Sequence, residues 1–252
     1  MLKKDYPFIL PIKMDISNLS SSYFIIREPE CLCIMVNMYL SIIFFSLYFK
    51  PITNLSNNKI KLLLLLHNFI SIVTSVYIFT GIIYETTSHD YYLYGNEIDY
   101  SHKSLTHYIW IFHISKYYDC VDTFIMIIRN SFKQITFVHV YHHTSVILYT
   151  WLILYNHPGG DFYLSALMNA WVHIWMYSYY MLSSFITHKN KRRKYLWWSK
   201  HLTKVQISQF VVNCAHCMYA LLYSSKMIYM IGLAHQFSFI VLFGNFFYKK
   251  YI

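Results

Sequence analysis

The chain has 252 residues, of which 56% are hydrophobic and only 13% are charged, and its formal net charge is +10. So apolar a composition argues against one or two soluble domains and predicts a chain largely embedded in lipid. The positive charge would suggest a nucleic-acid ligand if it formed one surface patch, but its distribution between loops argues against that partner.

Apolar stretches of about 20 residues, long enough for a helix to cross a bilayer, follow one another along the chain. We expect seven membrane spans, at 31–49, 60–83, 105–128, 136–156, 162–186, 202–224 and 228–248. Neither an internal repeat nor a long linker separates them. The sequence therefore predicts an all-α polytopic membrane protein, with a single membrane-embedded domain over residues 1–252.

The distribution of Lys and Arg between the loops predicts the orientation. One set of loops and the tail after the last span hold 14 Lys and Arg, whereas the opposite loops hold only Lys103 and Lys226. Because basic loops remain in the cytosol, we expect a lumenal N-terminal tail, 1–30, and a cytosolic C-terminal tail, 249–252. The positive charge is then a marker of topology.

Short motifs in the tails agree with this orientation. Asn18 begins a glycosylation sequon in the lumenal tail, whereas the sequon at Asn54 lies in a loop expected in the cytosol, so only Asn18 should be modified. Lys249 and Lys250 match the cytosolic di-lysine retrieval signal of endoplasmic-reticulum membrane proteins. Lysines that end a helix at a membrane face are the alternative reading. The five cysteines lie in apolar segments and indicate no disulfide framework.

The segment HVYHH at 139–143 places three imidazoles inside an otherwise apolar span. At about 100° per residue, the three rings fall within an arc of roughly 100°, so they can point into one cavity away from lipid. Ionisable side chains within a membrane span mark a functional site by default. A metal site, a proton relay and a nucleophile are all open at this point.

Polar side chains of the neighbouring spans are expected at the same depth, in the cytosolic half of the membrane. They are Lys116, Asp119 and Asp122 in the third span, Asn169, His173, Tyr177 and Tyr180 in the fifth, and Thr203, Gln206, Gln209 and Asn213 in the sixth. Taken singly, they could be a neutralising ion pair, interfacial aromatics, a core histidine or hydrogen bonds between helices. Their convergence favours a buried site, because such groups are costly in lipid unless they face one another.

These motifs resemble those of the fatty acid elongase (ELO) family. KYYDCVDT at 116–123 is similar to its K-x-x-E-x-x-D-T, and HVYHH matches its H-x-x-H-H. NAWVHIWMYSYY at 169–180 and TKVQISQF at 203–210 are similar to its other two blocks, N-x-x-x-H-x-x-M-Y-x-Y-Y and T-x-x-Q-x-x-Q-F. The blocks occur in order and the resemblance covers nearly the whole chain. Asp119 stands where the family usually has Glu, which keeps the charge and shortens its reach by one methylene.

The resemblance implies condensation of a long-chain acyl-CoA with malonyl-CoA to give 3-oxoacyl-CoA, CoA and CO2, without a cofactor or a metal. It also implies that the second to the seventh of the seven membrane spans enclose an acyl-chain channel. The expected protein partners are the 3-oxoacyl-CoA reductase, dehydratase and enoyl reductase of the elongation cycle. A homodimer is also compatible with the resemblance. Gln134, before the histidine motif, leans toward long or polyunsaturated chains.

A neutral imidazole is a competent nucleophile toward a thioester, so we expect His142 to accept the acyl group, with His173 opposite it. Cys120 is disfavoured because a neighbouring carboxylate opposes the thiolate. The other expected site residues are His139, His143, Lys116, Asp119 and Asp122 for orientation and proton movement, Asn169, Gln206 and Gln209 as oxyanion donors, Tyr177, Tyr180 and Thr203 around the substrate, and Arg192, Arg193, Lys200 and Lys204 for the CoA phosphates. Anionic lipid is the alternative ligand for those four basic residues.

Two other classes of protein also place histidines or polar groups within membrane spans. A membrane di-iron desaturase or hydroxylase needs about eight histidines from several clusters, whereas this chain has one H-x-x-H-H. A seven-span transporter or receptor can also gather polar groups in its core, but helix breaks are expected near the midplane, and Pro and Gly are scarce inside these spans. Both alternatives are weaker than a condensing enzyme.

Overall fold

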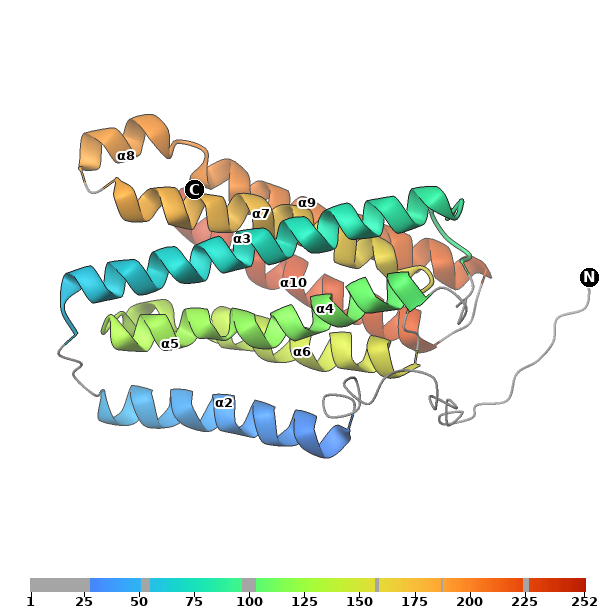
Figure 1. Ribbon diagram of the computed structural model, residues 1–252, viewed down its shortest axis with the longest axis horizontal. Coiled ribbons are helices and arrows are strands. Elements are labelled where there is room, and N and C mark those ends of the chain that lie inside the picture. The colour runs from blue at the N-terminus through green and yellow to red at the C-terminus, as the bar shows by residue number, and fades with distance from the viewer. Residues whose placement is uncertain (1–27, 51–54, 97–102, 157–158, 187, 224–226) are drawn as a thin grey trace, which may run out of the picture.

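The computed structural model describes residues 28–50, 55–96, 103–156, 159–186, 188–223 and 227–252. The regular secondary structure of these residues is entirely helical, and the long helices run side by side along the long axis of the molecule (Figure 1). The α-helices are α2 (Pro29–Phe49), α3 (Asn57–Ser88), α4 (Lys103–Asp119), α5 (Val121–Ile128), α6 (Phe137–Asn156), α7 (Phe162–Phe185), α8 (Lys189–Tyr195), α9 (Ser199–Tyr223) and α10 (Met227–Tyr251).

The turn between α5 and α6 brings two of the motifs together. Asn130 follows α5 with a φ of 56°, a left-handed conformation that Asn tolerates better than most residues. The short 3₁₀ helix Phe132–Gln134 then leads into α6. The chain therefore reverses within a few residues, and the histidines at the start of α6 lie close to the aspartates of 119–122.

Four of the helices, α2, α3, α9 and α10, are long and apolar enough to cross a membrane. The other three expected spans correspond to α4 with α5, to α6 and to α7. With 17 and 8 residues, α4 and α5 are each shorter than a membrane span, and α6 and α7 carry polar residues of the motifs. The all-helical polytopic membrane class is therefore confirmed. The count of seven spans remains a prediction.

Helix packing places α3, α4 and α7 together in one apolar cluster. It contains Ile78 and Ile82 of α3, Leu105, Ile109 and Phe112 of α4, and Tyr163, Ala166 and Ala170 of α7. Small residues at a helix interface allow the backbones to approach closely, and Ala166 and Ala170 serve this purpose on α7. α9 packs against α10 and α7, and α6 against α4, so these helices surround the motifs.

The helix α2 lies at the edge of the bundle (Figure 1). It buries Leu32, Tyr39 and Ile43 in a second apolar cluster with Cys120 and residues of α5 and α6. Its other large apolar side chains, such as Phe44 and Phe45, are exposed. An exposed surface of this kind suits contact with lipid.

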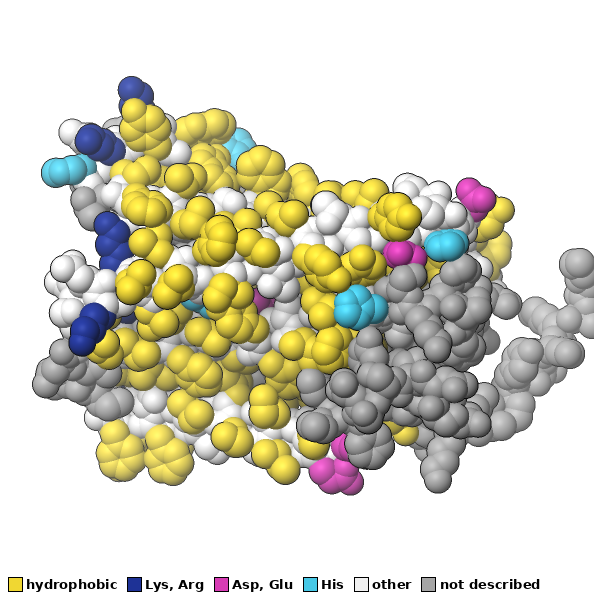
Figure 2. Space-filling model, in the orientation of Figure 1, with side chains coloured by type: hydrophobic (Ala, Val, Ile, Leu, Met, Phe, Trp, Pro, Cys, Tyr) yellow, Lys and Arg dark blue, Asp and Glu magenta, His cyan; other side chains and the backbone are white. Residues whose placement is uncertain are grey.

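The surface separates apolar from basic side chains. Figure 2 shows hydrophobic side chains across the middle of the visible face and Lys and Arg gathered at one end. The same end carries α8 and the C-terminus (Figure 1). The separation matches the expectation that basic loops lie together on one side of a membrane.

Candidate active site

The expected third span is interrupted at Cys120, between α4 and α5. The Cys120 backbone N–H donates to the carbonyl oxygen of Tyr117 at 3.2 Å, a tighter turn than the α-helical pattern. The chain continues in nearly the same direction, because Cys120 itself keeps helical dihedrals of −62° and −19°. Asp119 and Asp122, on either side of this turn, both reach the hydroxyl of Tyr177 on α7.

Tyr177 joins the two aspartates. Its hydroxyl lies 2.8 Å from Oδ2 of Asp122 and 3.1 Å from Oδ1 of Asp119, so one phenolic proton is shared between two carboxylates. Tyr177 is almost fully buried. The second oxygen of Asp122 accepts a hydrogen bond from Nε2 of His67 on α3 at 2.9 Å. Side chains from α3, α4, α5 and α7 thus meet in one network.

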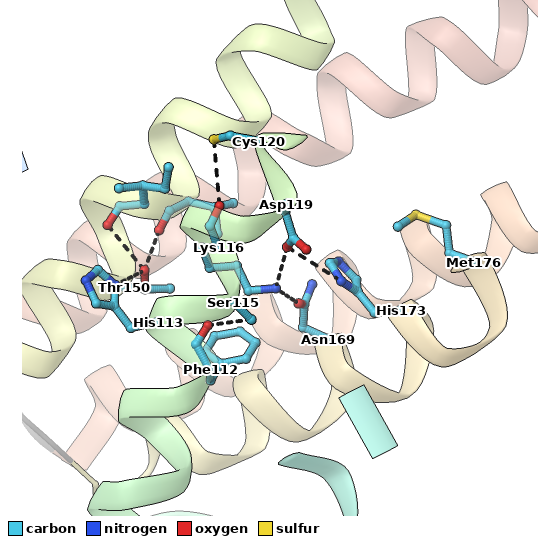
Figure 3. A network of polar contacts seen from close by, with 12 residues as sticks. Phe112, His113, Ser115, Lys116, Asp119, Cys120, Thr150, Asn169, His173 and Met176 are labelled. Carbon is cyan, nitrogen blue, oxygen red and sulfur yellow. Dashed lines mark hydrogen bonds and ion pairs between the residues drawn. The ribbon is translucent and has the colours of Figure 1, made fainter. Parts of the chain in front are cut away.

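Lys116 is the cation of this network (Figure 3). Its Nζ donates to Oδ2 of Asp119 at 3.1 Å and to Oδ1 of Asn169 at 2.9 Å, and it lies 4.4 Å from the centre of the Phe112 ring. Nδ1 of His173 lies 3.7 Å from the same Asp119 oxygen. A buried ammonium needs such partners to stay charged. Because the Asn169 oxygen accepts from Lys116, the NH2 group of this amide is left as a donor.

The three imidazoles of the histidine motif have different surroundings. Nε2 of His139 is hydrogen-bonded to Oγ1 of Thr123 at 2.8 Å, and the Tyr39 hydroxyl contacts the same Oγ1 at 2.9 Å. The His143 ring lies 4.5 Å from that of His139, centre to centre. These two imidazoles therefore line the side of the site formed by α5 and α2.

His142 instead lies toward α10. Its ring centre is 5.0 Å from that of Phe239 and 5.8 Å from that of Phe243. Its Nδ1 is buried and has no hydrogen-bond partner within the described residues. An imidazole with one uncommitted nitrogen in apolar surroundings is available for nucleophilic attack.

The helix α9 contributes a buried polar face. Thr203, Gln209 and Asn213 are buried, and Gln206 donates from Nε2 to the Met176 sulfur of α7 at 3.5 Å. Nδ2 of Asn213 lies 3.5 Å from Oε1 of Gln236 on α10. The expected stripe on this helix therefore faces α7 and α10.

The remaining expected residues lie nearer the basic end. The Tyr180 ring packs 6.0 Å from that of Tyr177, and Lys200 lies 5.7 Å from the Phe247 ring. Lys204, Lys249 and Lys250 are exposed. The side chains of Arg192 and Arg193, and all of Asn18, lie outside the described residues.

Comparison with known proteins identifies the family to which this chain belongs. Residues 24–252 match the family model described as ELO: GNS1/SUR4 family. This chain belongs to the ELO family. Three of the four motifs that resembled the family blocks supply side chains of the network, so the match covers the candidate site as well as the fold.

Several similar proteins are named as elongases. Fatty acid elongase 6 of Leishmania major is 34% identical over 196 residues, which are 74% of this chain and 51% of that protein. Very long chain fatty acid elongase 5 of Xenopus tropicalis is 37% identical over 147 residues, 57% of this chain and 48% of that protein. Very long chain fatty acid elongase 4 of Mus musculus is 30% identical over 200 residues, 77% and 63% respectively. The chain thus spans about half to two thirds of the length of these relatives.

Three residues of the ELO network were not expected from the sequence. They are His67, Thr123 and Tyr39, which bind Asp122, His139 and Thr123 respectively. The sequence could have identified His67 as a site residue, because it follows five consecutive leucines within a span. An imidazole there is as unusual as in the histidine motif. Thr123 lies in a quoted motif, but nothing in the sequence connects Tyr39 with the site.

The histidines and carboxylates of the site are residue types that can bind metal ions. Within the described residues, no three His, Cys, Asp or Glu side chains are grouped as a metal ion would require. The absence of a metal remains a prediction, which metal analysis of the purified protein can check.

Proposed function

We propose that this ELO chain condenses a long-chain acyl-CoA with malonyl-CoA to 3-oxoacyl-CoA, CoA and CO2, the first step of fatty acid elongation. The observation that carries the proposal is the buried network of Lys116, two aspartates, Tyr177 and His173, together with the histidine motif on α6, which packs against α4. Family membership and the names of the similar proteins support the same reaction. No cofactor is needed, because decarboxylation of malonyl-CoA supplies the carbon nucleophile.

In the first step, a nitrogen of His142 attacks the acyl-CoA carbonyl. The new C–N bond replaces the C–S bond, and CoA leaves as the thiolate. The oxyanion that forms during the attack needs hydrogen-bond donors fixed in advance. We assign this role to the NH2 group of Asn169, which Lys116 orients, and to Gln206 and Gln209 of α9.

In the second step, malonyl-CoA loses CO2 and the electron pair of the broken C–C bond forms an enolate. The enolate carbon attacks the acyl-imidazole, which releases His142 and gives the 3-oxoacyl-CoA. We assign to His173 the positioning of the malonyl group. His139 and His143, held by Thr123 and by each other, orient the histidine motif.

The substrate has a charged nucleotide head and an apolar tail, so it should lie along the membrane normal. We propose seven membrane spans, of which the second to the seventh surround an acyl channel. Tyr177, Tyr180 and Thr203 lie near the basic end of this channel. Lys200, Lys204, Arg192 and Arg193 would bind the CoA phosphates there. At the opposite end lies a small cavity of about 40 Å³, lined by polar residues such as Asp161 and Tyr229 as well as by Phe162 and Ile228.

Elongation by isolated membranes tests the proposed function. Membranes containing the chain, incubated with labelled malonyl-CoA and a panel of acyl-CoAs, should produce labelled chains two carbons longer. Membranes with an equal amount of the His142→Ala variant should not. Failure to extend any acyl-CoA would remove the proposed reaction.

We propose an endoplasmic-reticulum location with the basic end in the cytosol, where reductases and a dehydratase would process the product. Single Asn→Gln variants test the orientation by the size shift on deglycosylation. The shift should disappear in Asn18→Gln and persist in Asn54→Gln. Modification at Asn54 would reverse the proposed topology.

Replacement of Lys249 and Lys250 by Ser should move a fluorescent fusion of the protein out of the endoplasmic reticulum.

A further inference from the structure

The condensation consumes one proton in each turnover, and this requirement rests on the proposed function. Malonyl-CoA enters with an ionised carboxylate that leaves as neutral CO2. The broken C–S bond yields a CoA thiolate, which is released as the thiol. Acyl-CoA, malonyl-CoA and one proton therefore give 3-oxoacyl-CoA, CO2 and CoA. Because the site is buried, that proton needs a route.

A series of titratable groups, joined by hydrogen bonds except for a final ion-pair contact of 3.7 Å, leads from α3 into the site. Nε2 of His67 lies 2.9 Å from Oδ1 of Asp122, and Oδ2 of Asp122 lies 2.8 Å from the Tyr177 hydroxyl. The same hydroxyl lies 3.1 Å from Oδ1 of Asp119, whose Oδ2 is 3.7 Å from Nδ1 of His173. Figure 3 shows the last of these contacts. Each carboxylate uses one oxygen toward Tyr177, and its other oxygen faces His67 in Asp122 and His173 in Asp119.

The protonation of His67 follows from its partner. Asp122 can only accept, so Nε2 of His67 carries the hydrogen and Nδ1 is a bare acceptor. This Nδ1 is buried, with no hydrogen-bond partner within the described residues. Tyr118 of α4 and Tyr177 of α7 face the ring at 5.0 and 5.7 Å, and His143 of α6 interacts with it electrostatically. A buried acceptor without a partner requires an explanation, and transient protonation provides one.

We propose that this chain of groups carries the proton from His67 to His173. A proton binds Nδ1 of His67 while the Nε2 proton moves to Asp122. Tyr177 takes that proton and gives its own to Asp119, which passes one to His173. His173 then protonates the CoA thiolate. One proton enters and one leaves. The transfer moves the His67 hydrogen from Nε2 to Nδ1, so its return to Nε2 and rotation of the carboxyl and hydroxyl hydrogens must precede the next turnover. His67, which does not touch the substrate, acts as a positioning and relay residue.

The His67→Gln variant of the full chain in lipid nanodiscs tests the route. The Gln amide can still donate to Asp122, but it does not pass protons at neutral pH. We expect its elongation rate to fall by about tenfold or more, in the range of lost acid–base catalysis. The rate should also fall more steeply than that of the wild type as pH rises, with a larger solvent deuterium isotope effect. Ser75→Ala, on the same buried face of α3, should retain the wild-type rate and profile.

Each possible outcome decides the proposal. A His67→Gln rate equal to that of the wild type would overturn it, as would a slow variant with an unchanged pH profile and isotope effect, which would indicate a structural role. If His67→Gln does not fold, Tyr177→Phe interrupts the same route at its centre and must show the same pH and isotope changes. Absence of elongation by the wild type would instead contradict the proposed function.

Discussion

At the scale of single residues, the site depends on buried charges that compensate each other. Lys116 and Asp119 are each less than a tenth exposed, and their hydrogen-bonded pair is shared with Asn169 and His173. Removing one partner of a buried pair leaves an uncompensated charge, whereas removing both can be nearly neutral. The pair therefore allows the folding role of these charges to be separated from their role in the reaction.

We expect Lys116→Met to lower the free energy of unfolding by about 3–5 kcal/mol, because the Asp119 carboxylate remains buried without its cation. The double variant Lys116→Met with Asp119→Asn should recover most of that loss. Elongation should stay low in both, since neither orients the Asn169 amide through Lys116. Thermal unfolding followed by tryptophan fluorescence, with the elongation assay in parallel, makes the comparison. A double variant no more stable than the single one would contradict the compensating pair.

At the scale of elements, close packing of α3 against α4 holds the network together. Gly81 of α3 lies against the ring of Tyr108 on α4, and a Cβ at this position would overlap that ring. Gly244 of α10, by contrast, has nothing within 4 Å of an added Cβ. Gly81 and Gly244 thus form a matched pair for a packing test.

We expect Gly81→Ala to destabilise the protein by about 1–3 kcal/mol, because the overlap must be relieved by moving Tyr108 or the helices. Gly244→Ala should be neutral or stabilising by up to about 1 kcal/mol, since Ala favours helix over Gly. Midpoints of thermal unfolding for the two purified variants provide the readout. Equal effects at the two positions would contradict the close contact between α3 and α4.

Helix positions and motif contents were largely predictable from the sequence, whereas side-chain partners were not. Hydropathy and charge located every long helix within a few residues, and the four motifs contain most of the observed network. The break at Cys120 carries no Pro or Gly signal, so the span was expected to be continuous. The link from His67 to Asp122 joins residues 55 apart in the chain, and local pattern does not encode such pairings. The three imidazoles share one arc, yet His142 faces α10 because Phe239 and Phe243 pack there.

At the scale of the whole molecule, an apolar bundle holds a polar interior nearer to its basic end. Lys and Arg gather at the end where α8 and the C-terminus lie (Figure 2). The histidine motif begins α6, which follows the turn at this end (Figure 1). A thioester with a charged head would therefore meet the imidazoles while its tail extends along the bundle. We propose that His142 holds the acyl group between the two half-reactions.

Mass spectrometry of the purified protein after incubation with acyl-CoA alone, without malonyl-CoA, tests this claim most directly. The account predicts a mass increase equal to one acyl group, located on the peptide that contains His142, together with release of free CoA. Adding malonyl-CoA should discharge the adduct and yield 3-oxoacyl-CoA. Release of CoA that persists in His142→Ala, or an adduct on another residue, would contradict the acyl-imidazole account.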